Sequence, residues 1–262
     1  MTLRPLTLGL LTTLTLCTTI YASDYNEQML EEAHQLFRSA TNSAMYAEAA
    51  KQYEYLIKEE KIYNGHLFYT LGNCWLMAGH NGKAILNYRR SKSYIPGNPD
   101  LQYNLQSARA LCRDLIEEKP LHPLAACFLG WHFDTSPAFR WRMFSILWIG
   151  FWGAWIWMIR SQKRSARTSL IITGVLSFII LSSLIAETVM KQRTPPGVII
   201  EKEVLARKGN GEMYAPAFLA PLHSGTEFRL EERRGEWWKI RLADGQTCWI
   251  PASTAETIAL AK

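Results

Sequence analysis

Residues 65–98 read GHLFYTLGNCWLMAGHNGKAILNYRRSKSYIPGN, and the architecture of the N-terminal half can be worked out from these 34 residues. Both halves of the stretch carry large apolar residues at helical spacing. The small residues Gly72 and Ala84 stand where two antiparallel helices would come closest, and Pro96 would end the second helix. The stretch therefore predicts a pair of closely packed antiparallel helices.

The same spacing recurs more weakly on both sides. A second copy starts at Leu30 and a half-copy at Pro99, and Ala49 of the upstream copy corresponds to Ala84. The pattern resembles the tetratricopeptide repeat, and the resemblance implies an all-α solenoid over residues 23–119. The positions that match the repeat signature, and that we expect to pack the helices together, are Phe68, Leu71, Gly72, Trp75, Ala84, Tyr88 and Pro96.

Tetratricopeptide arrays bind extended peptides along a groove lined by their first helices, so the resemblance implies such a groove here. Asn73 and Asn104 fall at groove positions, and an asparagine side chain can both donate to and accept from a peptide backbone. Tyr69 is predicted to line the groove with them. The alternative is that both asparagines only follow the general repeat consensus.

Two uncharged runs, residues 143–159 and 168–186, are long enough to cross a membrane. They predict transmembrane helices over residues 139–160 and 168–187. A buried hairpin in a soluble domain is the disfavoured alternative, because both runs are apolar on every face. The loop 161–167 and its border carry four basic residues and no acidic one, namely Arg160, Lys163, Arg164 and Arg167. The positive-inside rule places this loop in the cytoplasm, and both flanking domains then lie outside.

Shorter patterns assign the segments around the hairpin. Residues 1–22 are typical of an export signal, with an uncleaved N-terminal anchor as the alternative. Residues 120–138 predict an interfacial segment, and residues 188–196 predict a linker. Arg140 and Arg142 flank the outer end of the hairpin, where positive charge counts against the predicted orientation.

The net charge of +6 comes from the membrane region alone. Residues 121–194 hold eight Lys or Arg and two Asp or Glu, and the rest of the chain is neutral in sum. The same segment holds six of the ten Trp, which is typical of the flanks of a membrane span. The pattern predicts a lipid bilayer as a partner and argues against nucleic acid.

After residue 196 the sequence changes to short β-type runs separated by turns. Trp238, Ile240 and Leu242 alternate onto one face, and an Asp-Gly turn follows them. The motifs VLAR (204–207), GTEF (225–228), WKIRLADG (238–245) and WIP (249–251) follow in order. Together they resemble the bacterial SH3-like domain, which implies a small all-β barrel over residues 197–262.

Domains of this SH3-like family often bind peptides or cell-wall fragments in an aromatic groove, so the resemblance implies a ligand site. Tyr214, Trp237 and Trp249 are the candidate groove residues. The alternative is that Trp238 and Trp249 fill the core of a small barrel. Alternation places Trp237 opposite Trp238, so Trp237 is expected to be the exposed residue of that pair.

The sequence offers no constellation for catalysis. No CxxC pair or Cys/His spacing suggests a metal site, and no Ser or Cys nucleophile has a recognisable partner. There is no phosphate loop and no dinucleotide fingerprint. We therefore expect a non-enzymatic protein that needs no cofactor and no metal.

The order of segments is export signal, tetratricopeptide array, membrane hairpin and SH3-like domain. This order resembles the E-type proteins of the bacterial aerotolerance (Bat) operon. The resemblance implies a scaffold of the bacterial inner membrane with both folded domains extracytoplasmic, in an envelope or oxidative-stress complex. The implied partners are membrane proteins with von Willebrand factor A domains and a MoxR-type ATPase. The alternative is a sensor or anchor that binds peptidoglycan through the SH3-like domain.

Overall fold

The computed structural model describes residues 27–114, 116, 131, 135, 137–161 and 163–259. The predicted export signal, residues 1–22, and nearly all of the predicted interfacial segment, residues 120–138, lie outside the described residues. The chain divides into two compact units. The first consists of Met1–Ile116, Pro196–Leu242 and Gln246–Lys262, and the second of Glu117–Pro195 and Ala243–Gly245.

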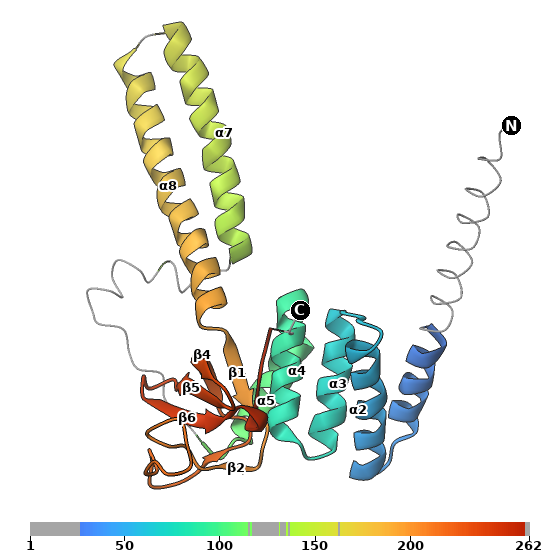
Figure 1. Cartoon of the computed structure of the whole chain (residues 1–262). Coiled ribbons are helices and arrows are strands. Elements are labelled where there is room, and N and C mark those ends of the chain that lie inside the picture. Colours follow the sequence, from blue (N-terminus) through green and yellow to red (C-terminus); the bar gives the residue numbers. More distant parts are fainter. Residues whose placement is uncertain are drawn as a thin grey trace, which may run out of the picture. The chain divides into compact units, whose positions relative to one another are not determined.

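The first unit begins with an array of helices. A helix over residues 27–39 is followed by α2 (Ser43–Lys58), α3 (Gly65–Met77), α4 (Asn81–Tyr94) and α5 (Pro99–Ala110). Figure 1 shows α2, α3 and α4 side by side, each packed against the next. Asparagine caps start three of these helices, because the side chains of Asn42, Asn64 and Asn98 each accept a hydrogen bond from a first-turn N–H.

The close approach of α3 and α4 depends on Gly72. A Cβ atom at this position would lie 2.5 Å from the ring of Tyr88, which is fully buried. The glycine therefore makes room for an aromatic ring at the centre of the helix pair. Among the other predicted packing residues, Phe68, Leu71, Trp75 and Ala84 are buried. Pro96 is exposed just beyond the end of α4, so it lies outside the core that these residues form.

The second part of the first unit is a small antiparallel sheet. Its strands are β1 (Pro196–Ile199), β4 (Glu227–Arg234), β5 (Trp237–Arg241), β6 (Thr247–Pro251) and β7 (Ala255–Thr257), in the order β6-β5-β4-β1-β7. The short strands β2 (Glu203–Val204) and β3 (Leu222–His223) form a separate pair. The core of this β region has at its centre the buried side chains of Ile199, Leu230, Ile240 and Ile250.

The second unit contains two long helices, α7 (Pro137–Ser161) and α8 (Arg164–Arg193). Their 25 and 30 residues correspond to roughly 37 and 45 Å, longer than a bilayer core of about 30 Å. Both helices are apolar enough to cross a membrane. The connection between them is shorter than the predicted loop, because Arg164 and Arg167 already lie in α8. Arginine is a good helix former, so a helix can continue through such a basic segment.

One ion pair joins the two long helices. Arg140 of α7 donates hydrogen bonds to the hydroxyl of Ser183, at 2.8 Å, and to the carboxylate of Glu187, both on α8. The Arg140 side chain is 4% exposed and that of Glu187 is 21% exposed. The pairing neutralises one of the outer positive charges that counted against the predicted orientation of the hairpin.

The coarse prediction from the sequence is confirmed. The described chain combines helices, two of them of membrane-spanning length, with a small antiparallel sheet. The assignments to the tetratricopeptide and SH3-like families remain predictions.

Candidate functional site

The three predicted groove residues of the helical array lie together. The Asn104 side-chain amide donates to the hydroxyl of Tyr69 at 2.9 Å and to Oδ1 of Asn73 at 3.1 Å. Tyr88, which was predicted only as a packing residue, adds a fourth group, because its hydroxyl donates to the same Asn73 oxygen at 2.7 Å. Burial raises the pKa of Tyr88 above its ordinary value, so this hydroxyl stays a donor. We call Tyr69, Asn73, Tyr88 and Asn104 the polar cluster.

The polar cluster keeps hydrogen-bonding capacity that its members do not use on each other. Asn73 Oδ1 accepts twice, but its Nδ2 has no partner among the described residues, and the same holds for Oδ1 of Asn104. Neither atom is sealed from solvent. One free amide donor on α3 and one free acceptor on α5 match the acceptor and the donor of a peptide backbone.

The three aromatic residues proposed for the sheet are placed differently from one another. Tyr214 is 51% exposed, Trp237 is half-buried, and Trp249 is only 8% exposed. Trp249 is covered by the guanidinium of Arg234, 5.5 Å from its ring centre. Among the described residues, no ring contact joins the three. Trp249 is thus buried, in agreement with the alternative interpretation, but it lies outside the central apolar cluster of the sheet, whereas Trp238, on the other face of the sheet, packs against that cluster.

The helical array and the sheet share an apolar core. Val198 of β1 is fully buried in the cluster formed by the helices, and Ile200 and Ile258 pack against the same cluster. Conversely, Ile116, which follows the array, packs against the core of the sheet. We call this contact the junction. The junction could not be predicted from the sequence, because the residues that meet there are separated along the chain by both long helices.

Polar contacts hold the junction at one end through Asp114. Its carboxylate accepts hydrogen bonds from the backbone N–H of His223 at 2.6 Å and from the Thr226 hydroxyl at 2.7 Å. Its other oxygen lies 2.6 Å from Nδ1 of the His223 ring. A second contact lies nearby, where Glu227 pairs with Arg109 at 2.6 Å and with Arg89 at 3.3 Å.

The start of α4 meets the sheet at Gly82. Its backbone N–H, one of the groups that a helix leaves unpaired at its N-terminus, donates to the hydroxyl of Ser224 at 3.1 Å. His80 occupies the N-cap position and makes no side-chain capping bond, so Ser224 acts as the cap from the sheet side. A Cβ at Gly82 would lie 2.4 Å from both the Ile199 carbonyl oxygen and the Ser224 hydroxyl.

The contacts of Asp114 at the junction lower the pKa of its carboxyl group. Burial by itself would raise this pKa, but the hydrogen bonds from His223 and Thr226 outweigh it and hold the pKa below its ordinary value. The ionised carboxylate is therefore favoured in the folded protein. Its contribution to stability is fully present above the ordinary aspartate pKa of about 4 and is lost as the pH falls through the lower folded value.

We therefore expect Asp114→Asn to destabilise the protein in a pH-dependent way. At about pH 6 the variant should lose about 1–3 kcal/mol, because the amide replaces a charged acceptor. As the pH falls below about 4, the difference from wild type should shrink, because the wild-type carboxylate is protonated there. Thermal unfolding of the full chain in neutral detergent measures both differences. A difference that stays constant over this pH range would contradict the assignment.

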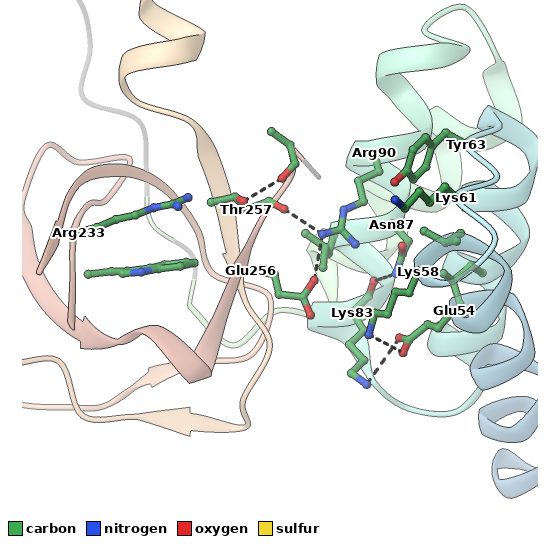
Figure 2. A pocket seen from close by; sticks show the side chains of 15 residues that line it. Glu54, Lys58, Lys61, Tyr63, Lys83, Asn87, Arg90, Arg233, Glu256 and Thr257 are labelled. Atoms are coloured by element: carbon green, nitrogen blue, oxygen red, sulfur yellow. Dashed lines mark hydrogen bonds and ion pairs between the residues drawn. The ribbon is translucent and has the colours of Figure 1, made fainter. Parts of the chain in front are cut away.

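A pocket of about 420 Å³ opens beside the junction. Helices α2 and α4, the turn after α2, and the sheet residues Arg233, Trp238 and Glu256 contribute to its walls. Figure 2 shows Arg90 reaching across to β7, where it bonds the Glu256 carboxylate at 3.0 Å and the Thr257 carbonyl at 3.0 Å. We call this cavity the junction pocket. Sequence reasoning missed it, because its walls come from both sides of the junction.

No protein-family model, curated protein or solved structure matches the chain. Among the residues that the structure describes, no group of three or more His, Cys, Asp or Glu could hold a metal ion. The arrangement of the polar cluster and of the junction pocket is therefore the basis of the functional conclusions below.

Proposed function

We propose that the protein is a non-enzymatic scaffold, anchored in the bacterial inner membrane by the α7–α8 hairpin, that binds partner proteins on the extracytoplasmic face. The polar cluster is the observation that carries this proposal. It presents an unused amide donor on Asn73 and an unused acceptor on Asn104, both within reach of solvent. A pair of this kind suits the backbone of an extended peptide.

The partners follow from the resemblance of the whole chain to the E-type Bat proteins. In this proposal the helices are a tetratricopeptide array, the sheet is an SH3-like domain, and the complex acts in envelope or oxidative-stress tolerance. The partners are membrane proteins with von Willebrand factor A domains, acting with a MoxR-type ATPase. No cofactor and no nucleic acid take part.

The composition of the first unit supports the hairpin topology. Residues before α7 and residues after α8 pack into one compact unit, so both must lie on the same side of any membrane. An even number of spans between them meets this requirement, and α7 and α8 are two candidate spans. The basic residues Arg160, Lys163, Arg164 and Arg167 then place the connection between the helices in the cytoplasm.

Co-purification from the native membrane tests the scaffold. The full chain, tagged and extracted in mild detergent after crosslinking, should bring down a protein with a von Willebrand factor A domain. The double variant Asn73→Ala with Asn104→Ala should lower its recovery about tenfold or more, because two hydrogen bonds to the partner are lost.

The matched control is Gln106→Ala, which removes an exposed amide from the same helix as Asn104. Its recovery of the partner should equal that of the wild type. Equal recovery by the double variant would show that the polar cluster is not the binding site. Failure to recover any such protein with the wild type would reject the proposed partners.

Binding of peptidoglycan through the sheet is the second candidate. The loop between β2 and β3 favours it, because Met213, Tyr214 and Leu219 are all exposed there and offer an apolar surface to a ligand. Sedimentation of the full chain with purified cell wall tests this candidate. The full chain is needed, because Val198 of the sheet is buried among the helices. Absence of co-sedimentation would remove this function.

A further inference from the structure

We propose that the junction pocket is a second binding site, for a short acidic peptide in which neighbouring carboxylates lie next to an apolar side chain. The site is distinct from the polar cluster, because none of the four residues of that cluster lines the junction pocket. The proposal stands whether or not the polar cluster binds a partner.

The charge of the pocket selects an anionic ligand. Five basic side chains and two acidic ones line it, which leaves a net charge of +3. Glu54 lies 3.4 Å from Lys58 and 3.9 Å from Lys83, and Glu256 lies 3.0 Å from Arg90. The two acidic side chains of the lining therefore pair with these three basic ones. The other two basic residues, Lys61 and Arg233, make no ion pair among the described residues, so they are available to the carboxylates of a ligand.

The guanidinium of Arg233 is positioned to bind a carboxylate of the ligand. Its guanidinium lies 5.3 Å from the centre of the Trp238 ring, which also lines the pocket. Stacking on an aromatic ring restricts the guanidinium while its N–H groups stay available, and a planar guanidinium fits a carboxylate with two parallel hydrogen bonds. The arrangement favours a carboxylate at this end of the pocket.

Asn87 indicates that the ligand is a peptide rather than a simple anion. This residue of α4 is 2% exposed and lines the pocket, where Figure 2 shows it between Arg90 and Lys83. Its Nδ2 donates to the Lys83 carbonyl at 2.8 Å, but its Oδ1 is buried without a partner. A buried acceptor of this kind needs a donor. A peptide brings several N–H groups along its backbone, whereas a carboxylate salt brings no donor and a hydrogen phosphate dianion brings a single O–H.

The size and the apolar part of the lining set the length of the ligand. A cavity of about 420 Å³ is far larger than a single inorganic ion and lies in the range of sites for small organic ligands. Ile57, Leu86 and Trp238 provide apolar wall next to the cations. This combination suits a few residues of a peptide that carries acidic and apolar side chains side by side.

Lys61 occupies a backbone position that does not favour lysine. Its φ of +53° makes it the one non-glycine residue with a positive φ in the described part of the chain. Glycine is the residue usually found where a helix ends in this conformation, because a Cβ disfavours it. The amine at the rim of the pocket is thus retained against the local backbone preference, as happens at ligand-binding sites.

Fluorescence anisotropy with a labelled peptide pool tests the proposal on the full chain in neutral detergent. The pool consists of hexapeptides whose two central positions are Asp or Glu and whose flanking positions are Leu, Ile, Val, Phe or Ala. A second pool carries Asn or Gln at the centre and differs only in charge. We expect the acidic pool to bind about tenfold tighter or more than the amide pool at about 0.15 M salt.

Three variants separate binding from folding. Lys61→Gly and Arg233→Gln each remove an exposed cation, and Asn87→Leu removes the buried acceptor at similar volume. Each should weaken binding of the acidic pool about tenfold without lowering the melting temperature. Lys92→Gln is the matched control, because it removes an exposed positive charge from α4 outside the pocket, and its affinity should equal that of wild type.

Five outcomes would overturn the proposal. Equal binding of the two pools, or no binding of the acidic pool, would exclude an acidic peptide. An equal loss with Lys92→Gln would mean general attraction between charges. Displacement of the acidic pool by inorganic phosphate at equal concentration would make the pocket a simple anion site. Unchanged affinity in all three pocket variants would place the peptide elsewhere on the protein.

Discussion

Gly82→Ala is expected to open the junction between the helical array and the sheet. The added Cβ would lie 2.4 Å from the Ile199 carbonyl oxygen, and this oxygen belongs to a paired strand that has little freedom to move. Overpacking of this kind costs about 1–3 kcal/mol. The Ser224 cap of α4 is lost as the surfaces separate, which adds about 1 kcal/mol. We therefore expect a loss of about 2–4 kcal/mol and a lower Tm by about 5–10 °C.

Gly97→Ala is the matched control for this variant. Gly97 has nothing within 4 Å of the position of a new Cβ, and its φ is not in the positive range, so alanine fits there without strain. The control should unfold within about 0.5 kcal/mol of wild type. Thermal unfolding of the full chain in neutral detergent measures both variants.

The reactivity of Cys112 reports where the Gly82 variant has opened. This thiol lies at the junction, 2.5 Å from the position of a Cβ on Gly225, and burial raises its pKa. Labelling with a maleimide, read by mass spectrometry for each cysteine, should be faster at Cys112 in Gly82→Ala. Buried Cys74 and Cys248 should label as slowly as in wild type. Faster labelling at all three would mean global unfolding instead of an open junction.

The two proposed binding sites depend on the junction to different degrees. The junction pocket exists only while the array and the sheet are packed together, because its lining comes from both. The polar cluster lies entirely on the helices and does not need the sheet. We therefore expect Gly82→Ala to remove binding of the acidic peptide pool and to leave capture through the polar cluster largely intact.

Sequence periodicity was sufficient for the local structure. Ala49 and Ala84 stand at equivalent places in two copies of the repeat pattern, as do Tyr53 and Tyr88, and all four side chains are fully buried. A position that must be small or must fill a helix interface shows itself in a repeat, because the same contact recurs at a fixed spacing. The long apolar runs of α7 and α8 are visible for a similar reason, since their composition is uniform over many residues.

The same approach could not find the junction. Asp114 and His223 are joined in space but separated along the chain by the α7–α8 hairpin, and nothing in the residues near either one indicates the other. From the sequence, Gly82 is only a residue with low helix propensity; its role becomes clear only from the structure, where the Ile199 carbonyl oxygen packs against it. Asn73 and Asn104 were found because each has a place in the repeat pattern, whereas Asn87 gained its meaning only from the wall of the pocket.

Glu187→Leu is expected to have the largest effect in the second unit. It removes the carboxylate on α8 that pairs with the Arg140 guanidinium, whose side chain is 4% exposed. Removing one member of a buried ion pair costs about 3–5 kcal/mol. Arg140→Leu should cost less, because Glu187 is 21% exposed and its carboxylate can turn toward water. The asymmetry follows from the different burial of the two charged side chains, because the guanidinium of Arg140 is less exposed than the carboxylate of Glu187.

The double variant Arg140→Leu with Glu187→Leu separates a charge effect from a loss of packing. It removes both charges of the Arg140–Glu187 pair, so it should recover most of the stability that Glu187→Leu loses. Arg142→Leu is the control, because Arg142 is an exposed arginine on the same helix, and it should change stability by less than about 0.5 kcal/mol.

Titration with a denaturing detergent, followed by the fluorescence of the tryptophans in α7, measures the separation of the two helices in the wild type and the four variants. If the double variant is as unstable as Glu187→Leu, then shape and packing at this place hold the hairpin, and the ion pair does not. If it recovers, Arg140 and Glu187 fix how α7 lies against α8. The positive charge of Arg140, which counted against the predicted orientation, then stabilises the packing of α7 against α8.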